Sequence, residues 1–462
     1  MSQLKAKYLS ALDLNELTAL MKELNVPAFR AKQIFQEITG KFNSDVLAMK
    51  SLPGDLRQTL AEQLWQSPVV LKETVECGQN VKKLLLALED EEVIEVAVIP
   101  DEERVTLCLS TQVGCPVQCR FCASGRGGLV RNLLAGEIME SFLCGCRIAG
   151  KKVDNIVFMG IGEGLLNCRE LFKALELLTG NFEMSPRRIT VSTSGYVPGI
   201  LKFAQLQREF NLAISLHAPD DETRAKLIPE ALRYPVKDIL DAADIWSKKC
   251  NRQYTLEYTL IAEINDSNLH AEALGRLAYR HHAKVNLIPY NDTKSSTFKR
   301  PGRERIEEFM AIVKAAGARC TRRVERGSGG KAACGQLRVN ALKNTLLWFF
   351  ILALLFLAPG CQAFRRMFAP YQPKNTAQST GTAEKRSSRD PVRDMFGMPE
   401  RAEDAPQILS SSDLSAREQE ILRAHYQSGR RDPDILRLHE NMKRKQKAND
   451  ERVFGKNPFG ER

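Results

Sequence analysis

The spacing of apolar residues changes along the chain from helical to strand-like. Over residues 1–66, apolar positions recur on one helical face, and Asp13 and Pro27 stand where a helix cap and a helix start are expected. Residues 81–88 and 93–99 are short apolar segments separated by an acidic turn, as in a hairpin. This pattern predicts an N-terminal helical domain, residues 1–66, followed by a β-hairpin linker, residues 67–103.

From residue 104 to 341, strand patterns and helix patterns alternate. Strands are predicted at Val105–Leu109, Asn155–Met159, Arg188–Ser192, Leu212–Leu216, Tyr254–Ile261 and Lys284–Pro289, and helices at 134–149, 169–180, 235–249, 268–281 and 303–316. Parallel strands joined by crossover helices predict an α/β fold with a partial (βα)6 barrel. Binding sites in such folds lie at the carboxyl ends of the strands. Polar and glycine-rich residues follow the predicted strands there: Cys115, Gly162-Glu163, Ser192, Ser215-Leu216-His217 and Asn291.

Beyond the barrel pattern, the chain changes character twice. An unbroken apolar run, Leu346 to Ala358, leads to Cys361. It is short for a spanning helix, which needs about 20 residues, and it resembles a bacterial lipoprotein signal. We therefore treat 342–361 as a signal-like segment and 362–462 as a polar, largely disordered tail. One hypothesis is that two reading frames are joined, a cytosolic enzyme and a downstream lipoprotein; the rival is a membrane-tethered enzyme.

Composition narrows the class of protein. The 462 residues include only 12 cysteines, which excludes a disulfide scaffold, and the cluster-like spacing of three of them favours a reducing, cytoplasmic compartment. The net charge of +11 fits a polyanionic partner such as RNA, although the charge is spread along the chain.

The segment with the clearest chemistry holds Cys115, Cys119 and Cys122 in a C-x3-C-x2-C spacing. Three thiolates can hold a four-iron cluster and leave one iron open for a substrate. A structural zinc site normally takes four protein ligands, so the spacing favours the cluster over zinc.

The cysteine spacing resembles that of the radical-SAM superfamily, in which the open iron binds S-adenosylmethionine. Seven segments in the same order resemble one branch, the RlmN family: Arg104–Cys108 leading to Cys115, Gly128–Leu133, Glu163–Asn167, Ser192–Gly195, Ser215–Pro219, Asn286–Asn291 and Ala332–Leu337. The resemblance covers residues 8 to 341. It implies an enzyme that methylates C2 of adenine in 23S rRNA and, in some members, tRNA, in the cytoplasm and with no membrane partner for the enzyme core.

The resemblance also implies the roles of individual residues. Cys115, Cys119 and Cys122 would hold a [4Fe-4S] cluster. S-adenosylmethionine would be bound by Gly162, Glu163, Ser192, Ser215, Leu216, His217 and Asn291. Cys334 would carry the methyl group as S-methylcysteine, Cys108 would resolve a covalent RNA adduct, and Glu95 would accept the C2 proton. Two S-adenosylmethionine molecules and a low-potential reductant such as flavodoxin would be consumed.

The sequence departs from the family pattern at two places, and two other functions are alternatives to adenine-C2 methylation. Gly164 stands where the family usually has proline, and Gly329-Gly330 stand where it usually has Asp-Ile. One alternative is a C8-adenine rRNA methyltransferase, a Cfr-like relative with the same cysteines. The other is a non-catalytic iron-sulfur protein that binds RNA. Taken singly, Cys108, Glu95 and His217 would each also fit ordinary packed or surface positions.

Overall fold

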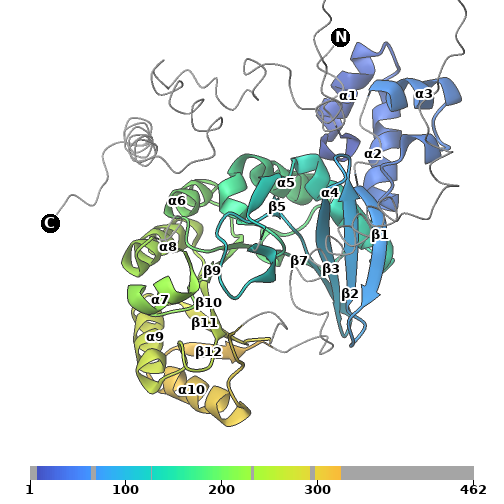
Figure 1. Ribbon diagram of the computed structural model, residues 1–462. Coiled ribbons are helices and arrows are strands. Elements are labelled where there is room, and N and C mark those ends of the chain that lie inside the picture. Colours follow the sequence, from blue (N-terminus) through green and yellow to red (C-terminus); the bar gives the residue numbers. More distant parts are fainter. Residues whose placement is uncertain (1–7, 64–68, 126, 230–233, 292–296, 324–462) are drawn as a thin grey trace, which may run out of the picture. The chain divides into compact units, whose positions relative to one another are not determined.

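A ten-stranded sheet forms the centre of the fold (Figure 1). The protein is described here by a computed structural model, which covers residues 8–63, 69–125, 127–229, 234–291 and 297–323. Cys334, the Gly329-Gly330 pair and the segments 342–361 and 362–462 lie outside these residues. In sheet order the strands are β1 (Val69–Glu76), β2 (Lys82–Leu88), β3 (Val93–Asp101), β4 (Arg104–Cys108), β7 (Asn155–Phe158), β8 (Ile189–Thr193), β9 (Asn211–Ser215), β10 (Thr255–Leu260), β11 (Lys284–Pro289) and β12 (Arg319–Arg322).

All neighbouring strands from β4 to β12 pair in parallel. The six strands predicted from the sequence are β4 and β7 to β11, and the expected α/β class with a partial barrel is confirmed. The strand β12 adds one more parallel strand at the edge. Helices follow the outer side of this curved sheet in Figure 1: α4 (Ala135–Ala149), α5 (Cys168–Gly180), α6 (Val197–Gln205), α7 (Asp221–Leu227), α8 (Val236–Cys250), α9 (Asn268–Arg280) and α10 (Arg303–Ala315). The sequence pattern missed α6 and α7.

The strands β1, β2 and β3 extend the same sheet on its other side, and here every pairing, including β3 with β4, is antiparallel. Side chains alternate between the two faces. Leu84, Val96 and Leu107 belong to the face that packs against α4 and are buried. Lys83, Glu95 and Cys108 belong to the opposite face, because Lys83 pairs with Ala97, Ala97 pairs with Cys108, and Glu95 lies two residues before Ala97.

Three N-terminal helices, α1 (Leu14–Glu23), α2 (Phe29–Lys41) and α3 (Gly54–Gln63), pack beside the sheet. The expected cap at Asp13 is present and forms a reciprocal capping box with Glu16. A buried hydrogen bond from the Ser44 hydroxyl to the Glu140 carboxylate, 2.6 Å long, joins the loop after α2 to α4. None of the helices in the described ranges has the length and apolar character of a membrane span.

Candidate active site

The three motif cysteines lie in the loop that connects β5 (Gln112–Gly114) to β6 (Leu129–Asn132). The Cys115 amide donates a 2.8 Å hydrogen bond to the Gly128 carbonyl, and the Cys122 amide donates a 3.0 Å bond to the Cys119 carbonyl. Gly114 has a φ of +79°, and a Cβ placed there would lie 2.0 Å from the Gly128 oxygen. Only glycine permits this turn, so the backbone closes tightly around the segment that carries the thiols.

The surroundings of these cysteines are apolar. Cys115 and Cys119 pack against a cluster that includes Val117, Leu227 and Tyr290. Burial raises the pKa of the Cys115 thiol to about 12, and it also raises that of Cys119, with the neighbouring cysteines as a further cause. Buried thiols that resist ionisation in this way become stable thiolate ligands only beside a cation.

This donor set, three cysteines on one loop, has the ligand type and number of a four-iron cluster with one open iron, whereas a structural zinc site normally takes four protein ligands. The apolar surroundings also suit a cluster, whose potential depends on exclusion of water.

Glu163 connects the loops at the ends of β7 and β8. Its side chain is 4% exposed and accepts hydrogen bonds from the Ser194 amide at 2.6 Å and the Leu165 amide at 3.2 Å. Its own amide donates to the Gln112 side chain at 2.8 Å. Burial raises the pKa of the Glu163 carboxyl, and the backbone donors oppose that rise. The turn at Gly164 is therefore held by Glu163, and Gly164 is not in the left-handed region that requires glycine.

His217 lies directly after β9 and touches the cysteine loop. Its ring stands edge-on to Phe121 at a centroid distance of 4.9 Å. Its Nδ1 accepts from the Thr259 amide at 3.1 Å, which leaves Nε2 as the protonated donor of the neutral ring. Burial, with the Arg224 charge as a second cause, lowers the pKa of His217 to about 3. The imidazole is thus neutral at physiological pH and offers one N–H.

The remaining residues expected to bind S-adenosylmethionine lie at the carboxyl ends of neighbouring strands. Ser192 is half-buried on β8, Ser215 is half-buried on β9, and Leu216 is fully buried just after β9. Gly162 has a φ of +115°, and any Cβ there would lie 2.7 Å from Gln112 and Thr111 atoms. Asn291 is exposed and accepts from the Arg300 guanidinium at 3.4 Å. The strand order brings this set to one edge of the sheet.

Sequence reasoning missed Arg224, a fully buried residue of α7. Its guanidinium donates to the carbonyls of Leu216 at 3.2 Å and Tyr234 at 3.1 Å, and also to the carbonyl of Ser194. The Arg224 charge acts to lower the pKa of both Cys119 and His217. A buried arginine on a short polar helix gives no recognisable periodic signal, because its role is set by carbonyls in the segments that follow β8 and β9 and precede α8.

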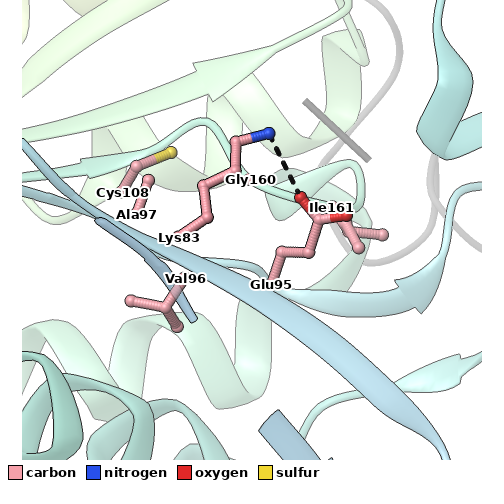
Figure 2. Close-up of a pocket in the computed structure, with 7 residues that line it drawn as sticks. All are labelled: Lys83, Glu95, Val96, Ala97, Cys108, Gly160 and Ile161. Atoms are coloured by element: carbon pink, nitrogen blue, oxygen red, sulfur yellow. Dashed lines mark ion pairs between the residues drawn. The ribbon is translucent and has the colours of Figure 1, made fainter. Parts of the chain in front are cut away.

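Cys108 and Glu95 line one small pocket, about 30 Å³ in volume, on the inner face of the sheet (Figure 2). Its other lining residues are Lys83, Val96, Ala97, Gly160 and Ile161. A cavity needs about 10–15 Å³ of such volume for each water molecule. The pocket therefore has room for one or two waters and is too small for a nucleobase. Gly160 and Ile161 lead directly into Gly162 and Glu163, so the pocket adjoins the strand ends just described.

Hydrogen bonds fix this pocket against the loops of the barrel. The Ser110 hydroxyl donates to the Glu95 carbonyl at 2.7 Å and accepts from the Ile161 amide at 3.0 Å. Lys83 forms an ion pair with Glu95, with Nζ 3.7 Å from Oε2. Sequence reasoning assigned no role to Lys83. The sequence feature that could have identified Lys83 is an ionisable side chain within a predicted strand whose other residues are mostly apolar.

Comparison with known proteins gives a consistent result. A model of the radical SAM superfamily matches residues 109–273. A protein of Akkermansia muciniphila named probable dual-specificity RNA methyltransferase RlmN is 42% identical over 70% of this chain and 93% of its own length. A relative from Clostridium perfringens with the same name is 40% identical over 72% of this chain and 96% of its own.

Among solved structures, a radical SAM methyltransferase from Sphaerobacter thermophilus matches with a TM-score of 0.68 and 39% identity. It covers 71% of this chain and 98% of that one. Identities of this size over nearly the full length of the relatives leave no ambiguity about ancestry. The chain therefore belongs to the RlmN family of radical-SAM RNA methyltransferases.

Proposed function

We propose that this protein methylates C2 of adenine in 23S rRNA and in tRNA. The observation that carries the proposal is the shared pocket of Glu95 and Cys108, two residues from different strands that the proposed chemistry needs close to the same adduct. Its support from relatives is that proteins named dual-specificity RNA methyltransferase are similar over almost their whole length. The buried, neutral surroundings of the neighbouring strand ends suit a reaction that must exclude water.

The cofactor roles follow from the donor set. Cys115, Cys119 and Cys122 would hold a [4Fe-4S] cluster, and Gly162, Glu163, Ser192, Ser215, Leu216, His217 and Asn291 would contact S-adenosylmethionine. When bound, this pair supplies a methyl group for a protein thiol and, from a second S-adenosylmethionine, a radical that removes one hydrogen from that methyl group. A low-potential reductant such as flavodoxin would deliver the electrons.

The chain's own residues then act at the base. Cys334, which lies outside the described residues, would carry the methyl carbon, and that carbon would become bonded to adenine C2. Glu95 would take the C2 proton, and the unpaired electron left on the adduct would pass to a one-electron acceptor, a role that the oxidised cluster held by Cys115, Cys119 and Cys122 would supply. The Cys108 thiolate would attack the Cys334 sulfur, so that a disulfide forms and the carbon–sulfur bond breaks. The electron pair of that bond stays on the carbon, which takes a proton and becomes the product methyl group, and a cellular reductant later returns the disulfide to two thiols.

The test uses the full-length protein, purified anaerobically and supplied with S-adenosylmethionine, reductant and undermodified RNA. Digested nucleosides are compared with standards by mass spectrometry. We expect 2-methyladenosine. Formation of 8-methyladenosine instead would assign the protein to the C8 alternative. An intact cluster with neither methylated base nor 5′-deoxyadenosine would support the non-catalytic alternative.

Two cysteine variants test the assigned roles. Cys334→Ala should abolish methylation and leave 5′-deoxyadenosine release intact, and methylation that survives in this variant would refute the carrier role. Cys108→Ala should trap a protein–RNA adduct, visible as a nuclease-sensitive gel shift. Absence of the adduct would count against a resolving role for Cys108.

A further inference from the structure

Lys83 is placed by strand register beside both residues that the proposed reaction needs in this pocket. Lys83 on β2 pairs with Ala97 on β3, and Ala97 pairs with Cys108 on β4, so the three form one row across the sheet. Glu95 stands one step along the same face of β3 and is the diagonal neighbour of Lys83. Because Ala97 has only a methyl side chain, the middle of the row stays open, and the long lysine side chain can extend across it.

Figure 2 shows the result. The Lys83 side chain rises between the Cys108 thiol and the Glu95 carboxylate in this view, and the dashed line marks its ion pair with Glu95. The Lys83 and Glu95 side chains are 6% and 8% exposed, and Cys108 is also buried. Lys83 therefore brings a positive charge into a pocket that also contains a buried thiol.

Among the residues that the structure describes, the titratable groups that line the pocket are Lys83 from β2, Glu95 from β3 and Cys108 from β4, and the loop after β7 contributes Gly160 and Ile161. Burying an ion pair usually gains no stability over an apolar pair of the same size. A lysine placed in this position is thus better explained by the charge it supplies to its neighbours than by stability.

We propose that Lys83 is a positioning residue shared by Glu95 and Cys108: its ammonium group keeps the Glu95 carboxylate ionised and directed at the base, and it stabilises the Cys108 thiolate that resolves the adduct. This proposal rests on the function proposed above. Thiolates are favoured beside lysine, and a base must be unprotonated before it accepts a proton. One cation thus prepares the two late steps without touching the substrate.

The first experiment replaces the charge. Lys83→Met should lower 2-methyladenosine formation at neutral pH by about 100-fold, the lower range for loss of acid–base assistance, while 5′-deoxyadenosine is still released. The acid limb of the pH–rate profile should move to higher pH, and the nuclease-sensitive adduct should accumulate, less so at high pH where the thiol ionises unaided. Lys83→Arg should restore most of the activity and the profile.

The matched control is Lys82→Met. Lys82 precedes Lys83 on the same strand but pairs with Val98 on the opposite face of the sheet. Its loss should leave the rate, the pH profile and the amount of adduct unchanged. A Lys83→Met protein that retains its cluster and behaves like Lys82→Met would overturn the proposal.

A second measurement remains informative if Lys83→Met fails to fold. Glu95→Gln removes the anion that competes with Cys108 for the lysine charge and keeps the size of the side chain. The pH midpoint for alkylation of Cys108 by iodoacetamide, followed on its peptide by mass spectrometry, should then fall relative to the wild type. An unchanged midpoint would mean that Lys83 does not act on the thiol. This readout needs no RNA product, so it separates failure of the lysine proposal from failure of the proposed function, which the wild-type nucleoside assay reports.

Discussion

Two buried polar side chains beside the parallel strands, Glu163 and Arg224, bond to main-chain groups, whereas Lys83 and Glu95 in the antiparallel part pair with each other. Glu163 accepts from two main-chain amides, and Arg224 donates to three main-chain carbonyls. Lys83 and Glu95 instead form an ion pair that faces a pocket. The first arrangement fixes loops at the strand ends, and the second places an ion pair beside a pocket. Burial alone does not show how a polar side chain is held, but its partners do.

The strongest test of this contrast is Arg224→Met. The substitution removes the guanidinium donor of three carbonyls, two of them buried and that of Tyr234 half-buried, and each unsatisfied buried group costs about 1–3 kcal/mol. We expect the free energy of unfolding to fall by roughly 5 kcal/mol, measured by urea denaturation of the anaerobically purified protein. Arg187→Met is the control, because the Arg187–Glu209 pair is exposed and its loss should not be detectable. A small effect at Arg224 would show that the backbone contacts are not what holds these loops.

Removing the Lys83–Glu95 ion pair should lower the free energy of unfolding by less than Arg224→Met does, and a second substitution should restore most of the loss. Lys83→Met removes the ion-pair partner of the buried Glu95 carboxylate and should lower the free energy of unfolding by about 3 kcal/mol. The double variant Lys83→Met/Glu95→Gln should recover most of that loss, because no buried charge remains. The same urea titrations give the double-mutant cycle. If the two substitutions were simply additive, the residues would not be coupled and the contrast between the regions would fail.

Substitution of His217 should give the smallest change in the free energy of unfolding, and that change should develop only at acidic pH. Its folded-state pKa of about 3 lies below the ordinary value of 6.5, so the folded protein binds fewer protons than the unfolded chain. The contribution of His217 is complete above pH 6.5 and is lost as the pH falls from 6.5 towards 3. His217→Asn keeps an acceptor for the Thr259 amide and tolerates the φ of +59°.

Relative to wild type, the Asn variant should gain on the order of 1.4 kcal/mol for each pH unit below 6.5. Urea midpoints of both proteins at several values between pH 7 and 5 measure this difference. Parallel curves with no pH-dependent gap would mean that the imidazole is not kept neutral by its surroundings.

The sequence was sufficient for the elements with strong periodicity. The six central parallel strands and the helices α4, α5, α8, α9 and α10 were predicted nearly to their ends, because each has a long apolar face. The helix α6 was missed because Pro198 and Gly199 imitate a turn, although proline is well suited to the first turn of a helix. The strand β12 was missed because only Cys320 in it is buried.

The residues of the candidate site likewise divide into those that sequence patterns could identify and those that they could not. Motif residues such as Cys115 and Glu163 could be named from their order in the chain, and strand order then explains why they meet at one edge of the sheet. Lys83 and Arg224 could not be named, since their significance depends on register and on carbonyls contributed by other strands. A lysine in a short apolar strand has two possible faces, and only the pairing of β2 with β3 shows which one it occupies.

The pairing of β3 with β4 has a consequence for protein engineering. The stagger between Lys83, Glu95 and Cys108 is set by ladder contacts between neighbouring strands and not by the turn at residues 89–92. Insertions in that turn should be tolerated, because lengthening a loop costs little free energy. A single residue inserted within β3 between Glu95 and Ala97 would turn one of them onto the face that packs on α4. Library design on this scaffold can therefore vary the turn freely, provided that the strand itself keeps its length.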